Sequence, residues 1–414
     1  MILSIAIKSL NHRLTAVLLT MLSIIVSVSL LLSVEHLRIQ AKDSFGRTIS
    51  GVDLIVGAPT GQSNLLLYSV FRIGNPTNNV SWDSYQALAK LPSVKWSIPI
   101  ALGDSHRGFR VLGTTNDYFQ HFQYGSKQPL VMAQGTSLVS TFDAVIGSGV
   151  AKKLNYQIGD EIEMSHGLAE VSFTKHSDSP FIVKGILEPT GTPVDQTIHV
   201  SLEGLEAAHK SESEIHEILH QIEAGEQVDI DVDSVTAMFI GLNSKMQLFQ
   251  LQRGINQYKK EPMLAIIPGV AFAELWQLVG NVESLLLFIS ALILFSSLLG
   301  LATMLLTTVR ERRQEMAVLR AIGAHSRVVF LLIQMEAMLL SLTASVIALV
   351  LVWLGFQFGA KWLSAEYGLF IENSIFGLRS LAIIGIVSGA TFLIACIPAI
   401  SAYRQSIQHG LISK

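Results

Sequence analysis

The chain has 414 residues, of which 50% are hydrophobic and 15% are charged, and its mean hydropathy is +0.46. These values exceed those of a soluble domain of this size and favour a membrane protein. The net charge of −3 and the lack of a basic footprint in the sequence exclude a nucleic-acid-binding protein, and the single cysteine, Cys396, excludes an intramolecular disulfide.

The first apolar segment predicts a membrane-spanning helix. Residues 1–13 carry Lys8, His12 and Arg13 and are expected to be a cytoplasmic N-terminus, whereas residues 14–34 hold no charge. At 1.5 Å per residue this run reaches about 30 Å, the thickness of a bilayer core. A cleaved signal peptide is the alternative, but its apolar core would be shorter and would end at a small-residue cleavage site. We therefore expect transmembrane helix 1 at residues 14–35, continuing outward as a stalk.

Residues 36–280 have the texture of a mixed α/β domain, with short alternating runs, frequent glycines and polar turns. This region carries 18 Lys and Arg against 25 Asp and Glu, so it is acidic. Residues 52–56 are a predicted strand, and a second predicted strand begins at residue 181 and ends at Pro189. Residues 81–91 form a predicted helix capped by Ser81. We expect stalks and a large extracytoplasmic domain here.

The remainder of the chain predicts three more membrane helices with short connections. The expected transmembrane helices 2, 3 and 4 cover residues 281–309, 328–357 and 380–402. A short outer loop is expected at residues 358–379, and a cytoplasmic tail at residues 403–414.

A basic segment, residues 310–327, lies between the second and third apolar runs. It holds five arginines and two glutamates, so the positive-inside bias places it at the cytoplasmic face. Its apolar residues recur at helical spacing, which predicts a short amphipathic helix along the membrane. Such a helix is suited to bind a soluble partner. Its arginines are also expected to anchor it to lipid headgroups, and the two roles do not exclude each other.

The run RRQEMAVLRAIGA, residues 312–324, resembles the cytoplasmic coupling helix of FtsX/MacB-type ABC transporter permeases. That family has an R-x-x-E-x-x-x-L-R-A-I-G-A pattern directly after its second membrane helix. The tail Pro-Ala-Ile-Ser-Ala-Tyr-Arg, residues 398–404, resembles the closing motif of the same family. Within the large domain, the resemblance extends to a set of glycine and aspartate positions, which we interpret as fold determinants: Gly147, Gly159, Asp160, Gly185 and Gly191.

The resemblance implies an α-helical membrane protein with four transmembrane helices and a large mixed α/β extracytoplasmic domain between helices 1 and 2. It also implies a homodimer of permeases that works with ABC ATPase subunits in the bacterial inner membrane, surrounded by lipid. The sequence has no G-x-x-x-x-G-K-[ST] motif, so we expect ATP and Mg²⁺ to be held by a separate ATPase chain and no cofactor to be held by this one. The expected ATPase contacts are Arg312, Arg313, Glu315, Leu319, Arg320, Ala321, Ile322 and Gly323.

In that family, motion of the coupling helix reaches the extracytoplasmic domain through the stalks, a mechanism called mechanotransmission. The resemblance therefore implies a permease that exports or extracts a periplasmic or membrane substrate and is not itself an enzyme. A periplasmic adaptor or a substrate-binding protein is a further expected partner. A signalling subunit that transports nothing is an alternative within the same mechanism.

Histidines in the acidic part of the domain suggest two other functions. His209, Glu212, His216 and His220 follow one another at steps of three and four, which would form one stripe of a helix and a site for zinc. The alternative function is then a metal-handling ABC permease. His216, Glu217 and His220 also form an H-E-x-x-H motif, the zinc-binding and general-base pattern of metallopeptidases. A membrane-anchored zinc peptidase is the weaker hypothesis, because no further ligand follows the motif.

Two polar residues, Gln334 and Glu336, lie well inside the third apolar run. A carboxyl group at this depth is costly unless it is paired or hydrated, which makes it a functional candidate. Packing against the first or second helix through serine and threonine is the alternative.

Overall fold

The computed structural model describes residues 13–166, 175–223, 230–311, 326–367 and 375–408. The chain divides into two compact units. The helical unit comprises residues 1–40, 280–361 and 372–414, and the α/β unit comprises residues 41–279 and 362–371. The boundaries that flank the large domain lie between residues 40 and 41 and between residues 279 and 280. Both fall inside long helices.

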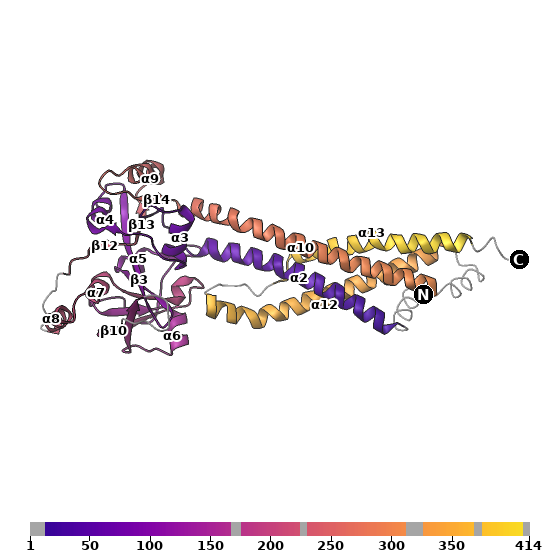
Figure 1. Ribbon diagram of the computed structural model, residues 1–414, viewed down its shortest axis with the longest axis horizontal. Coiled ribbons are helices and arrows are strands. Elements are labelled where there is room, and N and C mark those ends of the chain that lie inside the picture. Colours follow the sequence, from indigo (N-terminus) through magenta and orange to yellow (C-terminus); the bar gives the residue numbers. More distant parts are fainter. Residues whose placement is uncertain (1–12, 167–174, 224–229, 312–325, 368–374, 409–414) are drawn as a thin grey trace. The chain divides into compact units, whose positions relative to one another are not determined.

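Four long helices contain the predicted membrane spans (Figure 1). They are α2 (Leu14–Arg47), α10 (Pro268–Glu311), α12 (Ser326–Tyr367) and α13 (Leu378–Gln408). Within the described residues, these four are long and apolar enough to cross a bilayer. The predicted continuation of helix 1 into a stalk agrees with α2, which extends to Arg47, and α10 begins well before its apolar span.

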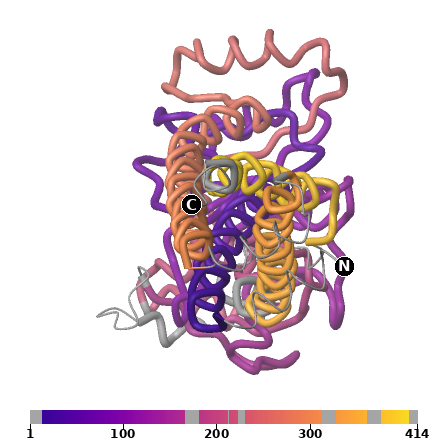
Figure 2. The backbone as a smooth tube through the Cα atoms, turned by 90° about the vertical axis from the view of Figure 1, so that its right-hand side faces the viewer, coloured from indigo at the N-terminus to yellow at the C-terminus, as the bar shows by residue number. Residues whose placement is uncertain are grey.

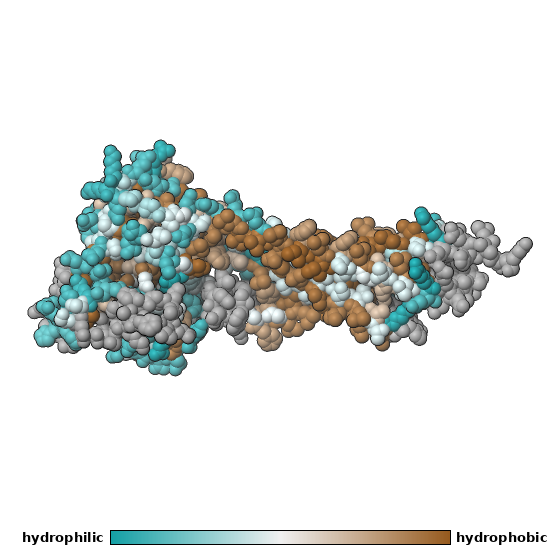
Figure 3. All heavy atoms as spheres, in the orientation of Figure 1, coloured by the Kyte–Doolittle hydropathy of each residue, from teal (hydrophilic) through white to brown (hydrophobic). Residues whose placement is uncertain are grey.

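The four spans lie side by side as a bundle when viewed end-on (Figure 2). Contacts between them include the ring of His36 on α2, whose centroid lies 4.7 Å from that of Phe356 on α12. Large apolar side chains such as Leu19, Phe288 and Leu393 are exposed on the outside of this unit. Figure 3 shows the resulting apolar surface, which is what a lipid-facing bundle requires.

The third long helix ends later than the sequence predicted. Helix α12 continues to Tyr367, whereas we expected transmembrane helix 3 to end at residue 357 and a loop to follow. The expectation followed hydropathy, which falls after residue 357. Residues 358–367 contain no proline and a single glycine, so nothing in the backbone chemistry stops the helix where the apolar run ends.

The α/β unit is built on a mixed sheet, ten-stranded in the described residues. Its order is β14-β1-β13-β3-β4-β11-β8-β10-β7, and β9 pairs with both β10 and β3. Strands β11 and β4 are parallel, as are β10 and β8, and the other pairs are antiparallel. The strands of this sheet are β1 (Leu54–Gly57), β3 (Val94–His106), β4 (Phe109–Thr114), β7 (Met132–Gly135), β8 (Asp143–Ile146), β9 (Glu161–His166), β10 (Lys175–Leu187), β11 (Thr197–Ser201), β13 (Ala237–Leu242) and β14 (Leu264–Ile266).

Short helices and two small sheets complete this unit. The small sheets pair β2 (Val80–Ser81) with β12 (Ser234–Val235), and β5 (Gln123–Tyr124) with β6 (Gln128–Pro129). The helices are α3 (Gln62–Phe71), α4 (Trp82–Ala89), α5 (Asp117–His121), α6 (Ser148–Leu154), α7 (Leu202–Ala207), α8 (Glu212–Glu223) and α9 (Leu248–Asn256), with short 3-10 helices at Pro193–Gln196 and Lys245–Gln247. The predicted cap at Ser81 is confirmed, because its hydroxyl accepts from the backbone N–H of Ser84.

The core lies on both faces of the sheet. Alternate side chains of β13 enter different apolar clusters: Phe239 packs on one side, and Met238 and Ile240 pack on the other. All six residues of this strand are buried. A strand buried on both faces is an uninterrupted apolar run, which is the pattern of its sequence, AMFIGL.

Two of the glycines that we interpreted as fold determinants illustrate different backbone requirements. Gly191 has φ of 67°, a conformation that favours glycine, and its N–H donates to the carboxylate of Asp195. Gly185 has no such φ; a side chain there would instead overlap the carbonyl oxygen of Thr136. Both positions therefore fix turns or strand packing without any ligand.

Candidate functional site

The predicted ATPase contacts lie outside the described residues. All eight, from Arg312 to Gly323, fall between the end of α10 at Glu311 and the start of α12 at Ser326. The structure describes the two helix ends that flank this segment. Next to it, Arg13 Nη2 of α2's N-terminal flank lies 2.6 Å from Glu311 Oε2, so an ion pair joins the first and second spans at this end.

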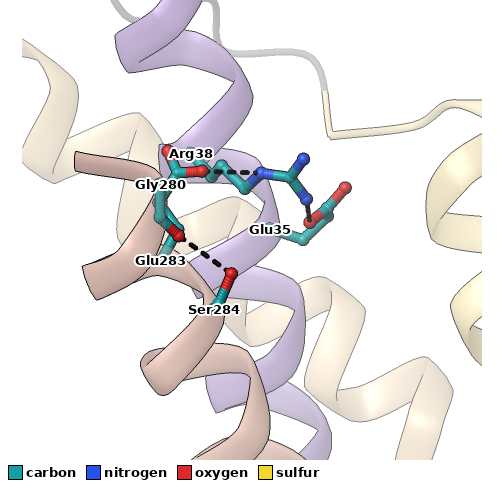
Figure 4. A network of polar contacts seen from close by, with 5 residues as sticks. All are labelled: Glu35, Arg38, Gly280, Glu283 and Ser284. Carbon is teal, nitrogen blue, oxygen red and sulfur yellow. Dashed lines mark hydrogen bonds and ion pairs between the residues drawn. The ribbon is translucent and has the colours of Figure 1, made fainter. Parts of the chain in front are cut away.

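A second ion bridge joins the same two helices near the other end of their spans (Figure 4). Arg38 of α2 donates from Nε to Glu283 of α10 over 3.1 Å, and from Nη1 to Glu35 over 3.0 Å. One guanidinium thus holds two carboxylates, one from its own helix and one from the neighbouring helix. The Glu283 side chain is 15% exposed and that of Arg38 is 41% exposed, so solvent partly screens this bridge.

The Arg38 bridge was not among the predicted sites. A signal was present, because Arg38 and Glu283 carry opposite charges just beyond the outer ends of two consecutive apolar runs. Sequence alone does not show that these two positions meet, since 245 residues separate them.

The intramembrane polar residues are buried between helices. Gln334 is 4% exposed and Glu336 is 2% exposed. Gln334 donates from Nε2 to the carbonyl oxygen of Phe392 over 3.2 Å and to Cys396 Sγ over 3.1 Å. Gln334 therefore bonds to the fourth span.

The same pair of helices meets again further along. Thr391 Oγ1 of α13 lies 2.9 Å from Ser341 Oγ of α12, and both residues are fully buried. Small residues on this face of α12, including Ala337 and Ala344, are also fully buried. Small side chains let helix backbones approach closely in a membrane, and the polar bonds add to this packing.

The histidine stripe is interrupted in the structure. His209 lies in the turn after α7, and α8 begins only at Glu212, so His209 is not on the helix that carries His216 and His220. The ring of His209 instead bonds the carbonyl oxygen of Leu205 over 2.7 Å and Asp104 Oδ2 over 3.2 Å. The prediction of one helical stripe of four ligands is therefore wrong for His209.

The contact with Asp104 changes the pKa of His209. The hydrogen bond from His209 to the buried carboxylate of Asp104 is the largest cause that raises the pKa of His209, and burial opposes it. His216, Glu217 and His220 are exposed on α8. Across the described part of the chain, no group of three or more His, Cys, Asp and Glu residues is arranged to hold a metal ion.

These features define an integral membrane protein that combines four membrane-length helices with a large extracytoplasmic α/β domain. Two protein-family models match the chain, and together they cover the large domain and the membrane helices. Residues 17–238 match the MacB-like periplasmic core domain, and residues 287–407 match the FtsX-like permease C-terminal domain. Since the first match alone covers more than half of the chain, the protein belongs to the FtsX/MacB family of ABC transporter permeases.

Two solved structures are similar to part of the chain. The periplasmic region of MacB from Actinobacillus actinomycetemcomitans is 11% identical, with a TM-score of 0.34, covering 56% of this chain and 95% of that one. The extracellular domain of the noncanonic ABC-type transporter YknZ from Gram-positive bacteria is 14% identical, with a TM-score of 0.30, covering 52% of this chain and 99% of that one. No curated protein matches the chain significantly. The family assignment rests on the two family matches.

Proposed function

We propose that the chain is the permease subunit of a bacterial inner-membrane ABC transporter that converts ATP hydrolysis by a separate partner chain into motion of its extracytoplasmic domain. Permeases of this family work with an ABC ATPase. In this proposal the partner holds ATP and Mg²⁺, and the coupling segment, residues 310–327, is the surface that it contacts. Two permeases form the working assembly, and the moving domain exports or extracts a periplasmic or membrane substrate.

One observation carries the proposal: α2 and α10 each continue without a break from a membrane-length apolar segment into residues of the α/β unit. At the far end of α2, the ring of Phe45 lies 4.7 Å from that of Phe71. At the start of α10, Ala271 is fully buried in the same apolar core, with Phe272 packed against it. A continuous helix with one end fixed in a core transmits rotation and tilt along its length, because its backbone bonds resist local deformation.

The two ion bridges support the proposal further. Arg13 with Glu311, and Arg38 with Glu283, join α2 to α10 at two levels of the helical unit. Ion pairs at two levels favour joint movement of the two helices, so displacement of the coupling segment at the end of α10 would also displace α2.

The proposal is tested by purifying the chain from its host in mild detergent. We expect an ABC ATPase to accompany it in stoichiometric amount, and Gly323→Arg to remove that subunit, because a bulky charge replaces a small residue in the contact. Gly254→Arg is the matched control: Gly254 lies exposed on α9, and a side chain there meets no neighbour within 4 Å. Absence of any ATPase from the wild-type preparation would overturn the proposal, as would retention of the ATPase by Gly323→Arg.

A further inference from the structure

Three polar side chains meet in the interior of the α/β unit without an acidic partner among the described residues. Arg72 follows α3, His199 lies on β11 and Tyr118 lies on α5. Arg72 Nη2 reaches Tyr118 Oη over a long 3.5 Å, and the His199 and Tyr118 rings are 5.1 Å apart. Arg72 Nε and Nη1, and His199 Nε2, are buried and have no hydrogen-bond partner in the described part of the chain.

The charges of this group are not compensated. Burial is the largest cause that lowers the pKa of Arg72; nearby Arg110 lowers it too, and Tyr118 raises it. No carboxylate is among these causes. Two of the three guanidinium nitrogens of Arg72 are buried without a partner, which is costly for a cation, so proteins rarely keep such a group without a use.

Neighbouring Arg110 does have a structural explanation. Its Nη2 donates over 2.8 Å both to the carbonyl oxygen of Gly74 and to Asn75 Oδ1, which holds the loop after Arg72 in place. Arg72 has no comparable set of bonds. It also has φ of 61° at the end of α3, a position usually given to glycine or asparagine. The packing of the loop therefore explains Arg110 and leaves Arg72 unexplained.

The tautomer of His199 specifies what kind of ligand fits. Its Nδ1 lies 3.1 Å from the carbonyl oxygen of Val145, which can only accept, so Nδ1 carries the proton. Burial, followed by the charge of Arg72, lowers the pKa of His199 to about 3, so the ring is neutral and Nε2 is an acceptor. The group thus offers charged donors from Arg72 and one acceptor from His199.

We propose that Arg72, Tyr118 and His199 form a binding site for a hydrogen-phosphate group, as found in inorganic phosphate and in phosphate monoesters. The unprotonated oxygens of such a group accept from the guanidinium of Arg72 and from the hydroxyl of Tyr118, while its P–OH donates to His199 Nε2. Sulfate has the same shape and charge type but no proton at neutral pH, so it leaves His199 without a donor. Tyr118 and His199 are fully buried, whereas Arg72 is half-buried, so a ligand would reach the group from the side of Arg72. The site is independent of the ATPase coupling proposed above.

The test is calorimetric titration of the full-length chain in detergent with inorganic phosphate and with sulfate. We expect saturable binding of one phosphate per chain, with sulfate weaker by about tenfold or more, the effect of one unpaired buried acceptor. Arg72→Gln should abolish phosphate binding. The matched control, Arg253→Gln, removes an exposed charge on α9 and should bind as the wild type does.

Thermal unfolding in phosphate-free buffer shows whether Arg72→Gln loses phosphate binding because it fails to fold. Arg72→Gln should not lower the Tm, because it removes an uncompensated cation, and added phosphate should raise the Tm of the wild type alone. Displacement of phosphate by glycerol 3-phosphate would assign a soluble monoester, whereas displacement only by phosphatidic acid vesicles would assign a lipid headgroup; both support the site. No saturable phosphate binding, equal binding of sulfate, binding retained by Arg72→Gln, or a sharply lower Tm of that variant would overturn it.

Discussion

At the scale of single residues, the pair of His209 and Asp104 makes a pH-dependent contribution to stability. A raised folded pKa means that the native state holds the proton more tightly than the unfolded chain does. The stabilisation is therefore complete below the ordinary histidine pKa of 6.5 and is lost as the pH rises through the higher folded pKa. His106, whose pKa is lowered chiefly by burial, acts in the opposite sense below 6.5, so the window above that value isolates His209.

We accordingly expect the Tm of the α/β domain to fall as the pH rises from about 6.5 to about 8.5. In His209→Gln this fall should be reduced, because glutamine cannot form the charged bond to Asp104. His216→Gln, which removes an exposed ring on α8, should keep the wild-type profile. Calorimetry of the full chain in detergent across this range measures the effect. A wild-type Tm that stays level above pH 6.5 would contradict it.

The histidine stripe also shows why spacing alone misled the sequence analysis. Steps of three and four predict one helical face only if a single helix runs through all four residues. Here α7 ends at Ala207, and Ser211 caps the new helix: the Ser211 backbone N–H donates to Glu214 Oε2 over 3.0 Å. The S-x-x-E pattern at residues 211–214 is a capping-box signal that marks the break in the sequence itself.

At the scale of helices, the Arg38 bridge is the clearest contact between the first two spans. We expect a double-mutant cycle with Arg38→Gln and Glu283→Gln to give a coupling free energy of about 0.2–1 kcal/mol, the range of partly exposed ion pairs. The coupling should decrease in high salt, which screens the charges. Unfolding of the full chain in detergent, followed by circular dichroism, measures it. Strictly additive effects of the two substitutions would show that the bridge does not join the helices.

A second prediction concerns the contact between α12 and α13. Ser341 is fully buried against Thr391, so Ser341→Leu inserts a large side chain into a packed interface and should destabilise the protein by about 1–3 kcal/mol. Thr343→Leu changes an exposed position on the same helix and should be tolerated. Thermal unfolding in detergent compares the two variants. Equal stability of both would mean that α12 and α13 do not pack through this face.

The membrane helices were predictable because a long uncharged run has one physical solution in a bilayer. Their partners were not, since hydropathy does not report which helix faces which, and Gln334 turned out to bond α13. The end of α12 was missed for a related reason: a helix that leaves the apolar layer loses its hydropathy signal without losing its hydrogen bonds.

In the large domain, strands β1 and β10 and the Ser81 cap followed from local patterns, whereas the order of the sheet depends on contacts between distant segments.

For the permease as a whole, the decisive question is whether ATP at the partner changes the extracytoplasmic domain. The two helices that connect the membrane spans to the α/β unit are continuous in sequence and in hydrogen bonding. Mechanotransmission therefore predicts a change in the domain upon ATP binding even when no substrate is present. A conventional permease, which only opens a path through its spans, would leave the domain as it was.

The most direct measurement is the distance between spin labels on two permeases of one reconstituted complex. Glu217→Cys places the label at an exposed position of α8, and Cys396→Ser removes the native thiol. With a hydrolysis-deficient ATPase, we predict that ATP and Mg²⁺ shift the distance distribution relative to the nucleotide-free complex, and that Gly323→Arg abolishes the shift. An identical distribution in both states, in a complex that binds ATP, would contradict mechanotransmission.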